Sequence, residues 1–130
     1  MAGSYTDYLE DKLLKHVFTN TTYTPPAAIY VGLFTAAPSD TGGGTEVTGT
    51  AYARQSAAFT VSGTGTVATN SANIDFPAAG SAWGTVTAVA LFDASTSGNM
   101  LAWSDLTTSR TIASGDIFRI PASGLSITQT

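Results

Sequence analysis

The sequence predicts a mainly β protein, an antiparallel, jelly-roll-like β-sandwich with one amphipathic α-helix at its N-terminus. Two observations predict this fold class. Only the first twenty residues place apolar side chains at a helical spacing. After them come about eight short β-like segments, spaced roughly ten residues apart and bounded by turn residues. Such a series of short strands is typical of a sandwich.

The N-terminal helix is predicted over residues 4–19. Its apolar side chains recur three or four residues apart and share one face: Tyr5, Leu9, Leu13, Leu14, Val17 and Phe18. Ser4 and Asp7 have the spacing of a capping box, and acidic residues precede basic ones, the order that the helix dipole favours. Because Pro25 and Pro26 cannot continue a helix, residues 20–26 are expected to form a linker.

Residues 27–130 are assigned to the β-sandwich, so that 1–130 forms a single domain with the helix. In the segment 27–35, Ile29, Val31 and Leu33 lie on one face of an expected strand, and Tyr30 and Phe34 lie on the other. Such a strand should be covered on both sides. The segment 83–94 is another strong strand candidate. Pro38–Gly49 contains three consecutive glycines and is expected to be a loop outside the core.

Composition excludes several functional classes. The 130 residues include no cysteine, which rules out disulfides, thiolate metal sites and cysteine nucleophiles. Charged residues make up 11 % of the chain and the net charge is −4, so no basic surface is expected that could bind nucleic acid. No apolar stretch approaches the roughly 18 residues of a membrane span. We therefore expect neither nucleic acid nor a membrane as a partner.

The residues of an active site are also missing from the sequence. There is no G-x-S-x-G motif, and the single histidine, His16, lies on the predicted helix beside Lys15. The loop after Asp93 offers oxygen atoms but lacks the spacing of an EF-hand calcium loop. We predict no catalytic residue, no metal ligand and no cofactor, and hence a protein that is not an enzyme.

Four aromatic residues are candidates for stacking against a receptor or a host surface glycan: Trp83, Trp103, Tyr30 and Tyr52. Exposed tryptophan and tyrosine form the sugar platforms of carbohydrate-binding sandwiches. Here each aromatic residue has apolar neighbours in a predicted strand, which favours packing in the core.

Four segments, in this order, resemble a family of short phage proteins described as tail-fibre-like or minor tail proteins. They are IYVGLFTAAPSDTGGGTEVTGTAYARQ (29–55), ANIDFPAAGSAWGTVTAVALFDA (72–94), GNMLAWSDLTTSRTIASGD (98–116) and FRIPASGLSIT (118–128). The most specific pieces are YARQ, IDFP followed by SAWGTVTAVALFD, and SGD-x-FRIPASGLSIT. With the amphipathic start included, the resemblance covers nearly the whole chain.

The resemblance implies a non-enzymatic structural component of a tailed bacteriophage particle, made in the cytoplasm of the bacterial host. It would act by assembling with itself and with other virion proteins, in the tail. Two alternatives stay open. One is a head-attached protein on the capsid surface, either a decoration (cement) protein or the base of a head spike. The other is a carbohydrate- or receptor-binding module.

The helix is the predicted assembly element. About four turns of helix are marginal alone in water, so the apolar face must be buried somewhere. It could pack on its own sandwich or against neighbouring proteins, and we predict the second, with these docking residues: Tyr5, Leu9, Leu13, Val17 and Phe18. The β-domain would then fold on its own, and a chain starting at Thr22 would fold without joining the particle.

Overall fold

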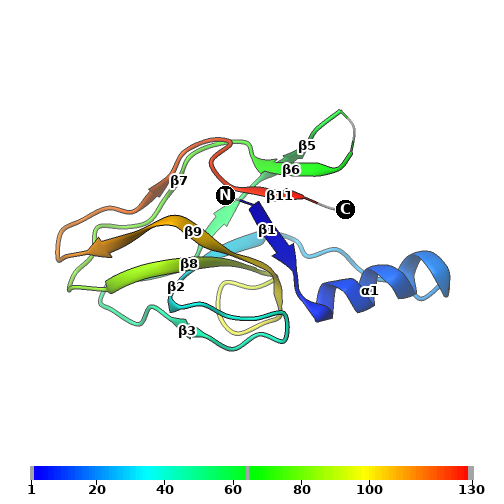
Figure 1. Cartoon of the computed structure of the whole chain (residues 1–130), viewed down its shortest axis with the longest axis horizontal. Helices are drawn as coiled ribbons and strands as arrows, with labels where there is room; N and C mark the ends of the chain where they lie inside the picture. Colours follow the sequence, from blue (N-terminus) through cyan, green and yellow to red (C-terminus); the bar gives the residue numbers. More distant parts are fainter. Residues whose placement is uncertain (1, 64, 129–130) are drawn as a thin grey trace.

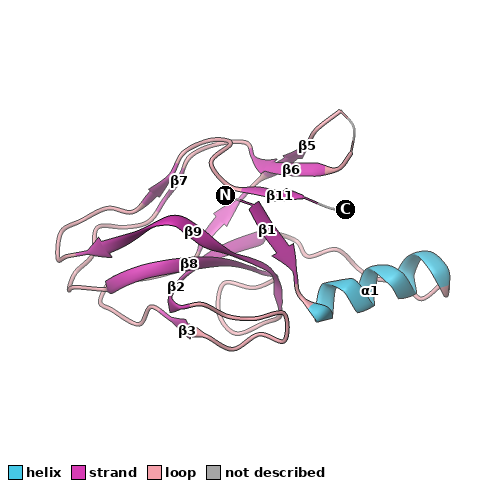
Figure 2. Cartoon of the chain, in the orientation of Figure 1, coloured by secondary structure: helices cyan, strands magenta, loops and turns pink. Residues whose placement is uncertain are grey.

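The chain folds into two packed β-sheets with a helix that projects from one end (Figures 1 and 2). This computed structural model describes residues 2–63 and 65–128. Its elements, in chain order, are β1 (Ala2–Tyr5), α1 (Asp7–Phe18), β2 (Ile29–Ala36), β3 (Thr45–Glu46), β4 (Gln55–Ala57), β5 (Phe59–Val61), β6 (Val67–Asn70), β7 (Ile74–Asp75), β8 (Gly84–Phe92), β9 (Met100–Ile112), β10 (Arg119–Ile120) and β11 (Ser126–Thr128). The predicted β-sandwich with one N-terminal helix is confirmed.

The two sheets share β1. The first sheet has β3 and β4 on one side of β2, followed by β8, β9 and β1, and the second runs β1, β11, β6, β5. β1 is antiparallel to β9 and parallel to β11, while the other strand pairs of the described residues are antiparallel. At the other edge, β4 pairs in the first sheet and β5 in the second, with only Ala58 between them. Strands that change sheets leave few open strand edges.

The N-terminal strand corrects the boundaries predicted from the sequence. Tyr5 belongs to β1 instead of the helix, and α1 begins at Asp7 after the N-cap residue Thr6. Thr6 is extended and its side chain accepts a hydrogen bond from the backbone of Leu9, so the predicted cap at Ser4 is wrong. β1 lies between β9 and β11. The sandwich is therefore not confined to residues 27–130.

The main core lies between the two sheets and a separate two-stranded sheet, β7 with β10, which contributes Ile74 and Ile120. A smaller cluster lies on the outer face of the first sheet. Val31 and Leu33 of β2 point into the main core, whereas Phe34 joins the outer cluster. In that cluster the rings of Phe34 and Phe92 are stacked with centroids 6.1 Å apart. β2 is thus covered on both faces, as its alternating pattern predicts.

The glycine-rich stretch Pro38–Gly49 is more closely tied to the fold than expected. It leads from β2 into β3, which pairs with β2. Val47 is 4 % exposed in the main core, and its backbone amide donates to the carbonyl of Leu33. The expectation that this stretch lies outside the core is wrong for Val47, because the β2–β3 pairing carries it back over the sheet.

Gly44 is expected to tolerate alanine less well than Gly43. Both have positive φ, +75° at Gly44 and +80° at Gly43. A Cβ at Gly44 would lie 2.7 Å from the carbonyl oxygen of Ala36, whereas a Cβ at Gly43 would meet nothing within 4 Å. Gly43→Ala should cost about 1 kcal/mol for the left-handed backbone, and Gly44→Ala about 1–3 kcal/mol more for the clash. Urea unfolding of both variants measures this, and equal losses would contradict it.

Candidate functional site

α1 is anchored to the sandwich through its first turn. Thr6 is 2 % exposed, its backbone amide donates to the carbonyl of Leu101 at 2.9 Å, and its hydroxyl donates to the carbonyl of Met100 at 2.7 Å. The amide of Asp7 donates to the carbonyl of Asp40 at 2.9 Å. β9 and the glycine-rich loop thus fix the direction in which the helix leaves the sheet. Within the described residues, no helix is long and apolar enough to cross a membrane.

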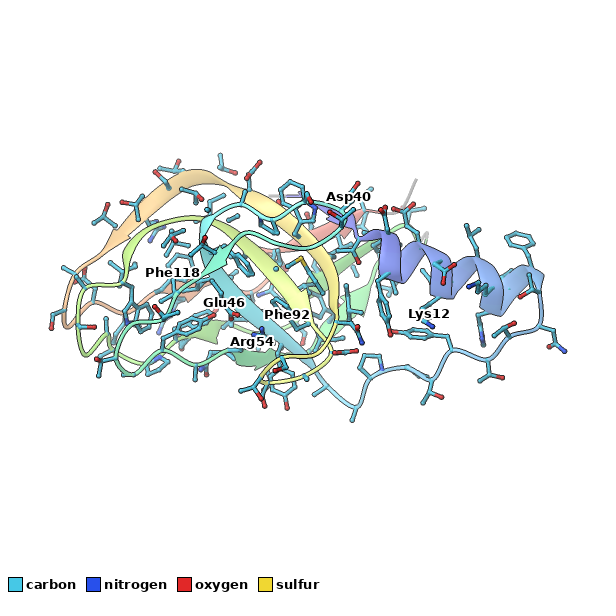
Figure 3. The ribbon with its side chains drawn as sticks, turned by 90° about the horizontal axis from the view of Figure 1, so that it is seen from below. Lys12, Asp40, Glu46, Arg54, Phe92 and Phe118 are labelled. Atoms are coloured by element: carbon cyan, nitrogen blue, oxygen red, sulfur yellow. The ribbon has the colours of Figure 1, made fainter. Side chains whose placement is uncertain are left out.

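One side of α1 is covered by the chain that returns from its end. The returning segment contains the predicted linker 20–26 and runs beside the helix (Figure 3). The amide of Thr21 donates to the carbonyl of Lys15, and that of Tyr23 donates to Nδ1 of His16 at 3.1 Å. Burial, together with the nearby Tyr8 and Asp93, raises the pKa of Tyr23. The return segment therefore packs on the side of α1 that carries Tyr8 and His16.

The other side of α1 leaves apolar side chains exposed. Leu14, Val17 and Phe18 are 58 %, 65 % and 78 % exposed, and we call these three residues the apolar tip. Among the described residues, Val61 and Ile117 are the other large apolar side chains exposed to a similar degree. No residue of α1 is buried. The chain itself therefore leaves the outer part of the predicted apolar face uncovered.

The predicted docking residues divide into three groups. Val17 and Phe18 are exposed, whereas Leu9 and Leu13 are half-buried. Tyr5 lies in β1 and packs against the main core, so it is not part of the helix face. Leu14, which flanks the predicted stripe, belongs to the exposed surface.

Three carboxylates gather at the base of the helix. The side chains of Asp7, Glu10 and Asp40, which we call the acidic base, are exposed and place one oxygen each within 4.8 Å of the others. Asp7 and Glu10 lie in the first turn of α1, where the helix dipole favours negative charge. Asp40 lies beside this turn (Figure 3) and accepts a hydrogen bond from Nε1 of Trp103 at 3.0 Å. These contacts account for the cluster, and we assign no metal to it.

The four aromatic receptor candidates lie in different environments. Trp83 is 5 % exposed in the main core and donates through Nε1 to the carbonyl of Thr50. The ring of Tyr52 packs edge-on against Trp83 and stacks on Phe76. Trp83 and Tyr52 therefore do not form a surface platform for a glycan. Trp103 and Tyr30 are half-buried, and they lie on neither α1 nor its tip.

The sequence did not predict a polar network that Glu46 forms with Tyr52 and Arg54. The Glu46 carboxylate accepts hydrogen bonds from the Tyr52 hydroxyl at 2.6 Å and from Nε and Nη2 of Arg54 at 2.8 and 2.9 Å. Arg54 also donates to the carbonyls of Ala94 and Ser97, and its guanidinium lies 3.5 Å from the centre of the Phe92 ring (Figure 3). The network connects β3, β8 and the β8–β9 loop. Tyr52 and Arg54 belong to the YARQ motif, which was the feature of the sequence that could have indicated this network.

Hydrogen bonds within this network keep the Glu46 carboxylate ionised. Burial acts to raise the pKa of Glu46, but the hydrogen bonds from Arg54 and Tyr52 outweigh it and the pKa is lowered. The pKa of Tyr52 is raised by burial and by its hydrogen bond to Glu46. Glu46 and Arg54 also line an open groove of about 630 Å³ that extends to the acidic base. Glu46 and Arg54 form an ion pair, so their opposite charges offset each other in this part of the groove.

Comparison with known protein families gives a match over nearly the whole chain. The family described as podophage GP4 fiber I protein gp80 matches residues 4–128. No curated protein matches the chain. The match supports the resemblance to phage tail-fibre-like proteins. It does not show that the chain is a minor tail protein. Since it covers α1, both sheets and nearly every described residue, the chain belongs to the podophage GP4 fiber I protein gp80 family.

Proposed function

We propose that this chain is a structural, tail-associated fibre component that attaches to another virion protein through the apolar tip of α1. Its β-sandwich would serve as a rigid body, and the projecting helix would hold it in place. The observation that carries the proposal is the apolar tip: three large apolar side chains exposed together on one helix. Exposed apolar residues that gather on one surface mark interaction sites more often than scattered ones.

Membership of a phage fibre family supports a virion component and argues against an enzyme. The head-attached alternatives, a decoration protein or a head-spike base, would use the same helix but a different neighbour. A gold label at the C-terminus, seen by electron microscopy of intact particles, separates them. Label on the tail supports the proposal, and label spread over the capsid surface contradicts it. A carbohydrate-binding role has less support, since two of its four aromatic candidates pack in the core.

Introducing charge into the apolar tip is expected to remove the chain from particles. The variant Leu14→Asp/Phe18→Asp should fold with an unchanged melting temperature, because both side chains are exposed. It is supplied from a plasmid to cells infected with the parent phage carrying a stop codon in this gene. Purified particles should then lack the chain when analysed by quantitative mass spectrometry.

The matched control makes the same chemical change elsewhere. Val61→Asp/Ile117→Asp alters two exposed apolar residues outside α1 and should enter particles normally. Normal incorporation of the Leu14→Asp/Phe18→Asp variant would overturn the proposal. Loss of both variants from particles would mean that the apolar tip has no special role.

A further inference from the structure

We infer that the partner of α1 is not a second copy of this chain but another virion protein, with an apolar groove that carries basic side chains at one end. This inference rests on the proposed function, since it names the chemistry of the protein on which α1 docks. It follows from the arrangement of charge along the exposed side of the helix and from the contacts of every basic side chain in the molecule.

The exposed side of α1 has two chemically different halves. Asp7, Glu10, Leu14 and Phe18 are three or four residues apart, and residues at this spacing lie above one another on a helix. The half nearest the sandwich carries the acidic base, to which Asp40 adds a third carboxylate. The outer half carries the apolar tip. A protein that covers the whole stripe must bury apolar surface at one end and meet negative charge at the other.

A second copy of this helix does not match that pattern. Two parallel copies would bring acidic base against acidic base, and like charges repel. Two antiparallel copies would place the carboxylates of one helix against the apolar tip of the other. The nearest basic side chains there, Lys15 and His16 of the last turn, are already bound to Asp11 and to the backbone amide of Tyr23. Neither arrangement satisfies both halves of the face.

The rest of a second copy does not offer the missing positive charge either. Of the five lysines and arginines, three pair with a carboxylate of their own chain, and the other two keep their charge and lie over an aromatic ring. Lys15 pairs with Asp11 at 3.1 Å, and Lys12 lies 5.5 Å from the centre of the Tyr8 ring. The arginines are similarly engaged: Arg54 with Glu46, Arg119 with Asp75, and Arg110 with the ring of Phe118. The two cations without a carboxylate partner, Lys12 and Arg110, lie on different elements, α1 and β9, so the described residues form no basic patch that could meet an acidic base.

A different protein with a basic-ended apolar groove satisfies both halves. An amphipathic helix that lies in an apolar groove is a common mode of recognition, and opposite charges at the rim fix its direction and register. The basic end of the groove would lie near the sandwich and the apolar end would receive Phe18. Because Thr6 fixes the helix direction, docking would also set the orientation of the whole sandwich.

Carbodiimide labelling of intact particles tests the identity of the partner. The reagent activates a carboxylate, a neighbouring lysine amine then forms an amide bond with it, and the reagent leaves as its urea. Particles are assembled with a mixture of ¹⁵N-labelled and unlabelled chain, so that links between copies are distinguishable from links within one. Amides between Asp7 or Glu10 and another virion protein, or protection of both carboxylates from added glycine ethyl ester, support the inference. Links between copies of this chain, or free labelling of both carboxylates, overturn it.

Removing charge from the acidic base separates this inference from the proposed function. Asp7→Asn/Glu10→Gln should lower incorporation into particles and reduce its dependence on salt, while Asp105→Asn, an exposed carboxylate outside α1, should change neither. Melting temperatures of both variants show whether the fold is kept. If the apolar-tip variant is lost from particles but Asp7→Asn/Glu10→Gln enters normally, docking through α1 stands and the basic groove is wrong. If both enter normally, docking through α1 itself is wrong.

Discussion

A chain that begins at Thr22 is expected to lose the cooperative unfolding transition of the full-length protein. The deletion removes β1, which lies between β9 and β11 and joins the two sheets. It also removes Thr6, whose amide and hydroxyl bind the carbonyls of β9. Each buried backbone group left without a partner costs about 1–3 kcal/mol, against a total stability of about 5–15 kcal/mol for a typical domain. Circular dichroism during urea unfolding measures the result.

This expectation reverses the one drawn from the sequence, in which residues 27–130 fold alone. The control keeps β1 and changes only the helix surface: Leu14→Asp/Phe18→Asp should retain a sharp transition. If the chain from Thr22 unfolds as cooperatively as the full-length protein, β1 contributes little and the sandwich is independent of its N-terminus. A broad transition or aggregation of the truncated chain, with the control intact, confirms that the N-terminal segment containing β1 and Thr6 is part of the cooperative fold.

The strands that could be predicted are those whose pattern is local. In β2, apolar residues alternate between two covered faces, and β8 forms a long apolar run, so both strands can be predicted from the sequence. β1 cannot be predicted in this way, because it has only four residues and pairs with strands near the other end of the chain. Tyr5 also continues the helical spacing of Leu9 and Leu13. Pairing with two distant strands outweighs this short local pattern.

The same distinction applies to the candidate site. The apolar face of α1 follows from side-chain periodicity, so Val17 and Phe18 could be identified from the sequence. The acidic base could not, because Asp40 reaches Asp7 and Glu10 only when the glycine-rich loop folds back to the helix. Which side of α1 stays exposed depends on the return segment, whose path has no signature in the sequence.

Arg54→Ala is expected to cost about 3 kcal/mol at neutral pH, within the range for breaking a buried ion pair. The side chains of Arg54 and Glu46 are 8 % and 25 % exposed, so the variant leaves the partly buried Glu46 carboxylate without its cation. Two carbonyl groups of the β8–β9 loop, at Ala94 and Ser97, lose their donor as well. Arg119→Ala is the matched control, because its ion pair with Asp75 is exposed and should matter little.

The pH dependence of this loss identifies its cause. In the natural protein the folded-state pKa of Glu46 is lowered, so its contribution to stability is present above the unfolded pKa of about 4.3 and is lost as the pH falls through the folded value. In Arg54→Ala, burial is opposed only by the hydrogen bond from Tyr52, and the pKa of Glu46 should rise relative to the natural protein. As the pH falls, protonation of Glu46 removes the unpaired charge from the variant. The difference in the free energy of unfolding between the variant and the natural protein should therefore shrink between pH 7 and pH 4. Urea unfolding at pH 7, 5 and 4 measures the difference, and a deficit that stays constant across this range would mean that Arg54 stabilises the fold through its carbonyl and Phe92 contacts and not through Glu46.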